Sequence, residues 1–289
     1  MATEVIKSVK TMQRRSASLQ QAGHTIALVP TMGFLHEGHL SLVDIARGKG
    51  DTVVMSIFVN PTQFGEGEDF EDYPRDFERD LSLAMDRGVD VIFWPGADDM
   101  YPENFSTHVE VKNLTEHLCG ASRPGHFQGV TTVVAKLFNI VQPDIAIFGQ
   151  KDAQQGFVLK RMIRDLNFPI DIVLGPIIRE EDGVAMSSRN TYLSEEEREQ
   201  ALSLYQGLQT AKKKVESGEV DSNIIIDKIR SVIEPNPDVE IDYIEVTDTE
   251  NLSPVETIEG QVLIAVAAYV GTTRLIDNII VSNNETNTT

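Results

Sequence analysis

Two histidines, His36 and His39, have the type and spacing that could carry out chemistry in this sequence of 289 residues. They lie three residues apart in the segment Pro30-Thr-Met-Gly-Phe-Leu-His-Glu-Gly-His39. An apolar run of strand type precedes this segment, and a run with helical spacing that ends at Gly48 follows it. We therefore expect a strand, a short loop and a helix whose first turn carries both imidazoles on one face.

A helix start of this kind favours a bound anion. Its first backbone N–H groups have no partners within the helix, and the positive end of the helix dipole attracts negative charge. Gly38 allows a ligand to approach the backbone closely, and the imidazoles add donors. Ordinary capping or surface histidines are the alternative that spacing leaves open. Zinc is a second alternative, but the metalloprotease motif His-Glu-x-x-His needs one more residue between the histidines.

Polar side chains also follow the other strands that we expect. They are Asn60 and Gln63 after one strand, residues 149–152 with Gln155 after another, and residues 179–189 after a third. Ligands of open α/β sheets bind beyond the carboxyl ends of the strands, where such loops gather. Lys151 supplies a positive charge for phosphate, and the two glutamines offer both donors and acceptors. Taken singly, each residue could be an ordinary surface or turn residue.

The elements that must position these loops alternate along the first two thirds of the chain. Expected strands cover residues 25–29, 51–60, 90–94, 144–148 and 170–174, and expected helices cover 40–47, 77–87, 130–141 and 155–166. A further helix, with an apolar stripe from Val5 to Leu19, would end at Gly23. Continuous apolar strands between amphipathic helices indicate the α/β class, a Rossmann-like parallel sheet with helices on both faces.

The pattern changes after Asn190. Helical spacing over 194–216 and 222–233 is followed by strand-like runs at 240–246, 261–269 and 274–281. We therefore expect two domains: a Rossmann-like domain of residues 1–184 and a smaller α+β domain of residues 185–289. The polar tail from Ser282 to Thr289 is expected to be disordered.

Composition excludes several classes of partner. A formal charge of −20, from 45 acidic and 25 basic residues, repels polyanions, so nucleic acid is not an expected partner. Cys119 is the single cysteine, and no run approaches the roughly 20 apolar residues of a membrane span. We expect a cytoplasmic protein that contacts no membrane. The acidic runs at 66–72 and 195–199 are most simply solvated surface.

Five segments together resemble one family. They are Pro30 to His39, Ser56-Ile-Phe-Val-Asn-Pro-Thr-Gln-Phe64, Arg123-Pro-Gly-His-Phe127, Phe148-Gly-Gln-Lys-Asp152 and Met186-Ser-Ser-Arg-Asn190. Their order and spacing are similar to those of the pantothenate synthetase family, the AMP-forming pantoate–beta-alanine ligases. The similarity runs on to Gly271-Thr-Thr-Arg-Leu-Ile-Asp-Asn278, so it covers nearly the whole chain.

The resemblance implies a reaction, cofactors and partners. Pantoate would attack the alpha-phosphate of ATP to form pantoyl adenylate and pyrophosphate, and beta-alanine would then displace AMP to give pantothenate, a precursor of coenzyme A. Magnesium is expected with the triphosphate. The family is usually dimeric, which implies a homodimer. The Rossmann-like domain would bind ATP and pantoate, and the smaller domain would act as a lid, with Arg189 near the hinge. Closure of the lid would exclude water from the adenylate.

The resemblance also assigns roles to residues. Three residues would be catalytic: His39, which would be the proton donor, together with His36 and Lys151. ATP would contact Met32, Gly33, Phe34, Leu35, His36, Glu37, Gly38, His39, Gly149, Gln150, Lys151, Asp152, Ile178, Met186, Ser187, Ser188 and Arg189. Gln63 and Gln155 would hold pantoate, with Gln63 also near beta-alanine and with Asn60 and Arg123 in support. Asp80 would assist the metal.

Two departures and two rival functions remain. Phe34 stands where the family often has a smaller residue, and Gln150 replaces a frequent glutamate; both affect loop packing rather than a charged catalytic group. One rival is a nucleotidyltransferase with a phosphate-bearing acceptor, which the neutral glutamines disfavour. The other is a non-catalytic binding protein with the same fold, which the retained His, Lys, Ser and Arg side chains disfavour.

Overall fold

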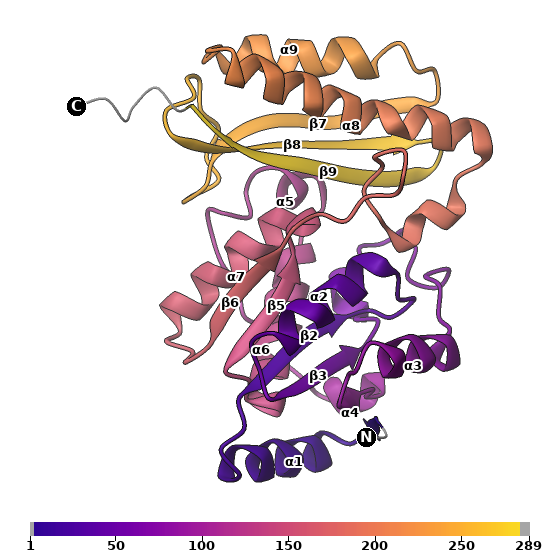
Figure 1. Ribbon diagram of the computed structural model, residues 1–289, viewed down its shortest axis with the longest axis vertical. Coiled ribbons are helices and arrows are strands. Elements are labelled where there is room, and N and C mark those ends of the chain that lie inside the picture. Colours follow the sequence, from indigo (N-terminus) through magenta and orange to yellow (C-terminus); the bar gives the residue numbers. More distant parts are fainter. Residues whose placement is uncertain (1–2, 284–289) are drawn as a thin grey trace. The chain divides into compact units, whose positions relative to one another are not determined.

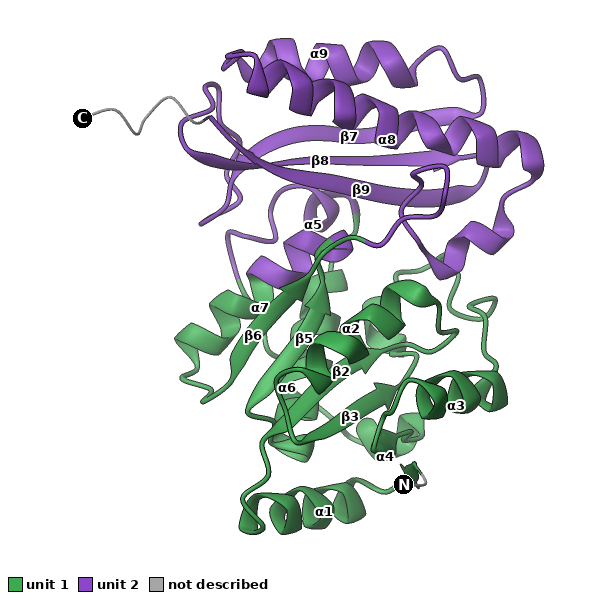
Figure 2. Cartoon of the chain, viewed as in Figure 1, with its two compact units in different colours: residues 1–111, 123–150, 158–177 green, residues 112–122, 151–157, 178–289 purple. Residues whose placement is uncertain are grey.

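The computed structural model describes residues 3–283, and the chain divides into two compact units. The first unit holds residues 1–111, 123–150 and 158–177, and the second holds 112–122, 151–157 and 178–289 (Figure 2). The division is therefore not a single cut of the chain, because two short early segments group with the C-terminal part. The expected domain boundary after residue 184 stays a prediction.

Within the described residues, six parallel strands form the sheet of the first unit, in the order β1-β4-β3-β2-β5-β6 (Figure 1). The strands are β1 (Glu4–Ile6), β2 (Ile26–Thr31), β3 (Thr52–Ile57), β4 (Val91–Phe93), β5 (Ile145–Gly149) and β6 (Asp171–Gly175). Every residue of β3 and β4 is buried. A strand buried on both faces needs a continuous apolar run, which is why the sequence pattern predicted this sheet.

Helices cover both faces of this sheet. They include α1 (Val9–Gln21), α2 (Glu37–Arg47), α3 (Phe77–Asp86), α4 (Ala97–Met100), α6 (His126–Val141) and α7 (Ala153–Asp165). Val43 of α2 and Ala84 of α3 share one buried cluster with Ala27 and Val53. Alternate strand residues such as Leu28 point to the opposite face, on the side of α1 and α6, which pack together. The predicted fold class is confirmed.

The order in which the chain adds strands to the sheet reverses at β2. Its neighbours are β3 and β5, with Ala27 opposite both Val53 and Ile145. The chain continues from β2 to β3 on one side and from β5 to β6 on the other. The loops that follow β2 and β5 therefore flank a topological switch point, where open α/β sheets form a ligand crevice.

The second unit contains an antiparallel sheet that two helices cover. Among the described residues the sheet has the order β7-β8-β9, with β7 (Val239–Asp248), β8 (Gln261–Val270) and β9 (Thr273–Ser282). Helices α8 (Glu195–Glu216) and α9 (Ser222–Ile233) bury apolar side chains against it, and α5 (Cys119–Ser122) also belongs to this unit. Ser194 and Glu197 form a reciprocal capping box that begins α8. This confirms the predicted α+β character.

Several expected boundaries differ from the structure, among them the expected strand 51–60, which ends at Ile57. Val5 and Ile6 pair with β4 instead of starting a helix, so α1 begins at Val9. Helix α6 begins at His126, four residues earlier than the apolar spacing predicted. Ser282 ends β9 rather than beginning a tail, and residues 284–289 of the expected tail lie outside the described residues.

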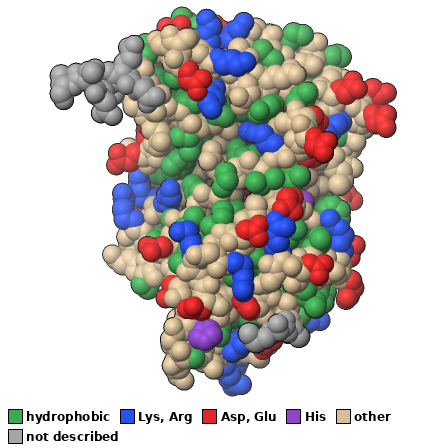
Figure 3. Space-filling view, viewed as in Figure 1, with side chains coloured by type: hydrophobic (Ala, Val, Ile, Leu, Met, Phe, Trp, Pro, Cys, Tyr) green, Lys and Arg blue, Asp and Glu red, His purple; other side chains and the backbone are tan. Residues whose placement is uncertain are grey.

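The surface of the described chain carries charges of both signs. Acidic and basic side chains are interspersed on the face in Figure 3. None of the described helices combines the length and the apolar character needed to cross a membrane.

Candidate active site

The loop between β2 and α2 folds around a buried carboxylate. Asp80 of α3 is 1% exposed, and its two oxygens each accept a backbone N–H at 2.7 Å, one from Phe34 and one from Leu35. Gly33 has a φ of +82°, and a Cβ there would lie 2.9 Å from Asp80 Oδ2. The path of this loop is therefore set by a side chain from another helix.

This geometry gives Asp80 a role that the resemblance did not provide. Burial raises the pKa of the Asp80 carboxyl, while the two backbone N–H groups and Arg79, 3.6 Å away, act in the opposite direction. The described residues contain no group of three His, Cys, Asp or Glu side chains that could hold a metal ion. Asp80 anchors the loop, and its assistance to a metal stays a prediction.

The two histidines form the start of α2 together. His36 is the N-cap, and its Nδ1 accepts the N–H of Gly38 at 3.1 Å. His39 Nδ1 accepts the N–H of His36 at 3.3 Å, and the ring centroids lie 4.0 Å apart. A neutral imidazole whose Nδ1 accepts a hydrogen bond carries its proton on Nε2. Each ring can therefore donate to a ligand through Nε2.

The helix start differs from the open one that the sequence argument assumed. The N–H groups of Phe34, Leu35 and Gly38 all have acceptors within the protein. Glu37, expected among the nucleotide contacts, forms an ion pair with Arg87. The imidazoles, rather than a row of open N–H groups, are the donors that this helix start offers an anion.

After β3, an amide network surrounds Gln63. Asn60, 1% exposed, caps the short helix η1 (Pro61–Gln63), and its Nδ2 lies 3.1 Å from Gln63 Oε1. Asn60 Oδ1 accepts the hydroxyl of Tyr101 at 2.7 Å. Gln63 itself is half-buried. Asn60 is thus placed to support Gln63, and direct contact of either residue with a substrate stays a prediction.

Arg123 supports the same segment from the other side. Its guanidinium binds both oxygens of Glu68 and donates to the carbonyl of Gln63 at 3.2 Å. His126 Nδ1 lies 2.7 Å from that carbonyl. Burial raises the pKa of the Glu68 carboxyl, but the hydrogen bonds and charge of Arg123 outweigh it, so the pKa is lowered. The acidic run at 66–72 is therefore not solvated surface throughout, because Glu68 holds Arg123.

The loop after β5 provides the next predicted residues. Gly149 ends β5, where it lies opposite Gly175 of β6, and the short helix η2 (Gln150–Asp152) follows directly. Gly149 and Gln150 are half-buried and belong to the first unit. The structure thus places Gly149 on the strand next to β2, the strand that leads to the histidine loop.

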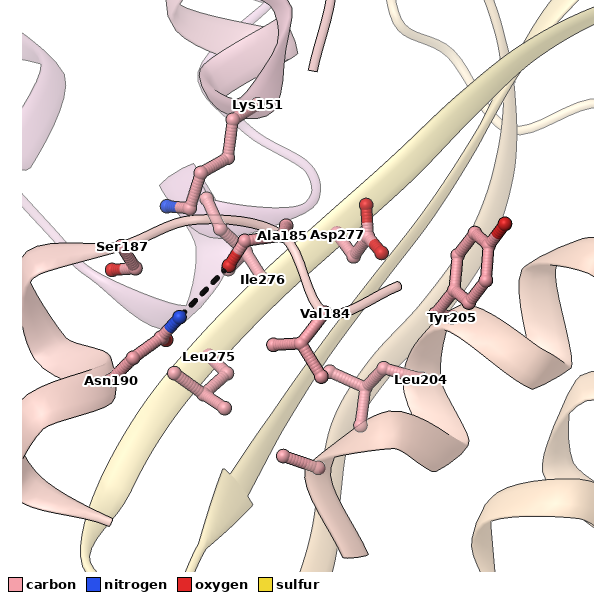
Figure 4. Close-up of a pocket in the computed structure, with 11 residues that line it drawn as sticks. Lys151, Val184, Ala185, Ser187, Asn190, Leu204, Tyr205, Leu275, Ile276 and Asp277 are labelled. Carbon is pink, nitrogen blue, oxygen red and sulfur yellow. Dashed lines mark hydrogen bonds between the residues drawn. The ribbon is translucent and has the colours of Figure 1, made fainter. Parts of the chain in front are cut away.

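In the second unit, Lys151 and Ser187 line one pocket with Asn190 and Asp277 (Figure 4). The pocket has a cavity volume of about 10 Å³, roughly the size of one water molecule. The Lys151 side chain extends toward the loop that carries Ser187 (Figure 4). This brings together two of the predicted phosphate contacts, a cation and a hydroxyl.

The loop that carries Ser187 is fixed at its base. Arg179 forms a two-pronged ion pair with Asp277 of β9, with N–O distances of 2.6 and 2.9 Å. Ile178 accepts the N–H of Met186 at 3.0 Å, so two predicted ATP contacts bind each other. Ser187 caps the short helix η3 (Ser188–Tyr192), which contains buried Ser188 and half-buried Arg189.

The first turn of α7 contains two glutamines that differ in role. Gln154 is buried, and its Nε2 donates to the carbonyls of Leu114 and His117 at 2.9 and 2.8 Å. Gln155, the predicted pantoate residue, is half-buried in the first turn of the helix, and Asp152 just before it is exposed. Gln154 thus binds the segment 112–122, which belongs to the same unit.

The sequence did not predict the roles of several supporting residues. Tyr101 and Glu68 act through contacts with residues far away in the chain, so no local pattern marks them. Asp277 lay within the segment Gly271 to Asn278 that shares the family resemblance, but its partner Arg179 is 98 residues away. His126 and Asn190 lay within the motifs that carry the family resemblance, but only the fold shows what they bind. Asn190 Nδ2 donates to Glu180 and to the carbonyl of Ala185 (Figure 4).

The fold and these residues define a class. The chain is an open α/β protein with an imidazole-capped helix at its topological switch point, joined to an α+β unit. Within that class it belongs to the pantoate-beta-alanine ligase family, whose profile matches residues 4–280.

Relatives agree with this assignment. The pantothenate synthetase of Moorella thermoacetica is 53% identical over 282 residues, which cover 98% of this chain and 100% of that protein. The pantothenate synthetase of Thermosipho melanesiensis is 57% identical over 278 residues, 96% of this chain and 99% of that protein.

Solved structures are similar as well. A pantothenate synthetase from Thermus thermophilus matches with a TM-score of 0.91 and 44% identity, over 96% of this chain and 99% of that one. A pantoate-beta-alanine ligase from Francisella tularensis, complexed with beta-gamma ATP and beta-alanine, matches with a TM-score of 0.80 and 32% identity, over 96% and 98%.

Proposed function

We propose that this chain condenses (R)-pantoate with beta-alanine in an ATP-dependent reaction that yields pantothenate, AMP and pyrophosphate. The observation that carries the proposal is the family match over residues 4–280. The related Francisella ligase, whose structure is a complex with beta-gamma ATP and beta-alanine, supports both substrates. The imidazole pair at the switch point of the sheet supplies donors for a phosphate group.

In the first step a carboxylate oxygen of pantoate attacks the alpha-phosphorus of ATP. A P–O bond to the carboxylate forms, and the P–O bond to pyrophosphate breaks, so negative charge moves onto the departing group. His36 and His39 donate to phosphate oxygens through Nε2, and Lys151 provides positive charge. Donors that are already in place stabilise this charge without the cost of reorganising solvent.

In the second step the neutral amine of beta-alanine attacks the acyl carbon of the adenylate. The new C–N bond forms as the C–O bond to AMP breaks, and the nitrogen gives up one proton. Gln63 and Gln155 hold the pantoyl group during both steps, so that the acyl carbon stays in position for the amine.

ATP contacts come from two sets of residues. One set is residues 32–39 with Gly149 and Gln150, and the other is Lys151, Asp152, Ile178 and residues 186–189. Magnesium would enter with the triphosphate, held mostly by phosphate oxygens and water, and would neutralise part of the phosphate charge. We also propose a cytoplasmic homodimer, from the single cysteine and from the family resemblance.

An ATP–pyrophosphate exchange assay tests this function. We expect exchange only when pantoate is present, and release of AMP only after beta-alanine is added. Exchange that depends on a phosphorylated acceptor instead of pantoate would show that the chain is a nucleotidyltransferase. No exchange with any acid would favour a non-catalytic binding protein.

A further inference from the structure

A chain of three side chains in the first unit ends at Gln63. The Tyr101 hydroxyl donates to Asn60 Oδ1 at 2.7 Å, and Asn60 Nδ2 donates to Gln63 Oε1 at 3.1 Å. Gln63 Nε2 then lies 3.0 Å from the sulfur of Met32. All four residues belong to the same compact unit.

The partners of Asn60 determine which end of its amide faces Gln63. The carbonyl of Gly129, 3.2 Å from Asn60 Nδ2, can only accept a hydrogen bond, so the nitrogen must face it. The backbone N–H of Thr62 and the hydroxyl of Thr62 both donate to Asn60 Oδ1. The oxygen and nitrogen of Asn60 are therefore fixed by the Gly129 carbonyl, which can only accept, and by the Thr62 backbone N–H, which can only donate.

The backbone of α6 makes this arrangement possible. A Cβ on Gly129 would lie 2.2 Å from the carbonyl oxygen of Thr62, so only glycine lets α6 approach η1 this closely. That close approach brings the Gly129 carbonyl within reach of Asn60, which is 1% exposed.

Tyr101 is held as a donor. Burial raises the pKa of the Tyr101 hydroxyl, although its hydrogen bonds with Thr62 and Asn60 act the other way, so the hydroxyl keeps its proton at neutral pH. The ring is held in place by an edge contact with Phe105, 5.1 Å between centroids, and by Lys136, 5.7 Å from the Tyr101 centroid.

We infer that Tyr101 is a positioning residue that holds the side chain of Asn60 in place. Asn60, whose orientation Gly129 and Thr62 set, then makes Gln63 present its amide N–H groups rather than its oxygen to pantoate. The inference rests on the proposed function, in which Gln63 holds pantoate. Because Gln63 Oε1 is occupied by Asn60, the side of Gln63 that meets the substrate is a donor. A thioether is a weak acceptor, so an oxygen of pantoate can replace Met32 as the partner of Gln63 Nε2.

The test is a double-mutant cycle of Tyr101→Phe and Gln63→Ala, followed by pantoate-dependent ATP–pyrophosphate exchange. Tyr101→Phe removes one donor and should raise the KM for pantoate about tenfold, with the KM for ATP unchanged. In the Gln63→Ala background the same substitution should change the KM for pantoate less than about twofold, because residues that act through one another are not additive.

Two further variants complete the test. Tyr269→Phe removes a hydroxyl from an exposed tyrosine of β8 and should leave both KM values at wild-type levels. Gln63→Glu replaces the N–H groups with an acceptor and should raise the KM for pantoate by about a hundredfold. Thermal unfolding of each variant checks that the fold is intact.

Four outcomes would overturn the inference. Equal effects of Tyr101→Phe in both backgrounds, or a parallel rise in the KM for ATP, would make Tyr101 a general structural residue. A KM for pantoate within about threefold of wild type in Gln63→Glu would show that Gln63 does not act as a donor. If the wild-type protein shows no exchange with pantoate, the proposed function fails together with the inference.

Discussion

The two units anchor their functional loops in different ways. In the first unit, the loop with His36 and His39 is held by Asp80, a carboxylate 1% exposed that accepts two backbone N–H groups. In the second unit, the loop with Ser187 is held at its base by the ion pair of Arg179, whose side chain is 19% exposed, with Asp277.

The difference predicts different costs of substitution. A buried acceptor of backbone N–H groups cannot be replaced by water, so its loss leaves unsatisfied donors in the interior. An ion pair with one partly exposed member can gain hydration when it breaks. We therefore expect removal of the anchor to cost more stability in the first unit than in the second.

The largest effect is expected for Asp80→Ala. Two N–H groups, those of buried Leu35 and half-buried Phe34, would lose their acceptors, which should lower the free energy of unfolding by about 3 kcal/mol. Chemical denaturation measures this. Asp80→Asn is the matched control, because one oxygen remains, and about half the loss should be recovered. A change below about 0.5 kcal/mol in Asp80→Ala would contradict the anchoring role.

A smaller effect is expected for Arg179→Met in the second unit. Asp277, 4% exposed, would lose the guanidinium that pairs with both of its oxygens and keep only the N–H of Asn278, so the free energy of unfolding should fall by about 2 kcal/mol. The double variant Arg179→Met with Asp277→Asn removes both charges and should recover part of this loss. If Arg179→Met costs more stability than Asp80→Ala, the comparison between the two units is wrong.

The smallest effect concerns the pH dependence of the Glu68–Arg123 pair. The pKa of Glu68 is lowered in the folded chain. Its contribution to the free energy of unfolding is therefore fully present above its ordinary pKa of 4.5 and is lost as the pH falls through the folded pKa. At pH 7 the free energy of unfolding of the wild type should be about 1 kcal/mol higher than that of Glu68→Gln, and this difference should disappear at acidic pH. A difference that does not depend on pH would exclude this ion pair as its cause.

The sequence predicted the regular elements better than the contacts between loops. Strands such as β3 and β5 were found because burial on both faces requires continuous apolar runs, and α8 because helical spacing runs from Ser194 to Glu216. The segment at Val5 was taken for a helix, since its pairing with β4 depends on residues far along the chain.

The supporting contacts of the site left no local signal. Asp80 lies 46 residues from Phe34, and Tyr101 lies 41 residues from Asn60. Hydrophobic periodicity reports which face of an element is buried, and it contains no information about which distant side chain meets a loop. The roles of Asp80 and Tyr101 therefore became apparent only when the fold brought these residues together.

The central claim is that the imidazoles at the start of α2 stabilise charge during adenylation through Nε2. The most direct test is the rate of pantoate-dependent ATP–pyrophosphate exchange in His39→Ala and His39→Gln. We expect His39→Ala to lower the rate about a hundredfold, and His39→Gln, which keeps an N–H donor near the position of Nε2, to retain much more of it. A wild-type rate in His39→Ala would contradict the claim.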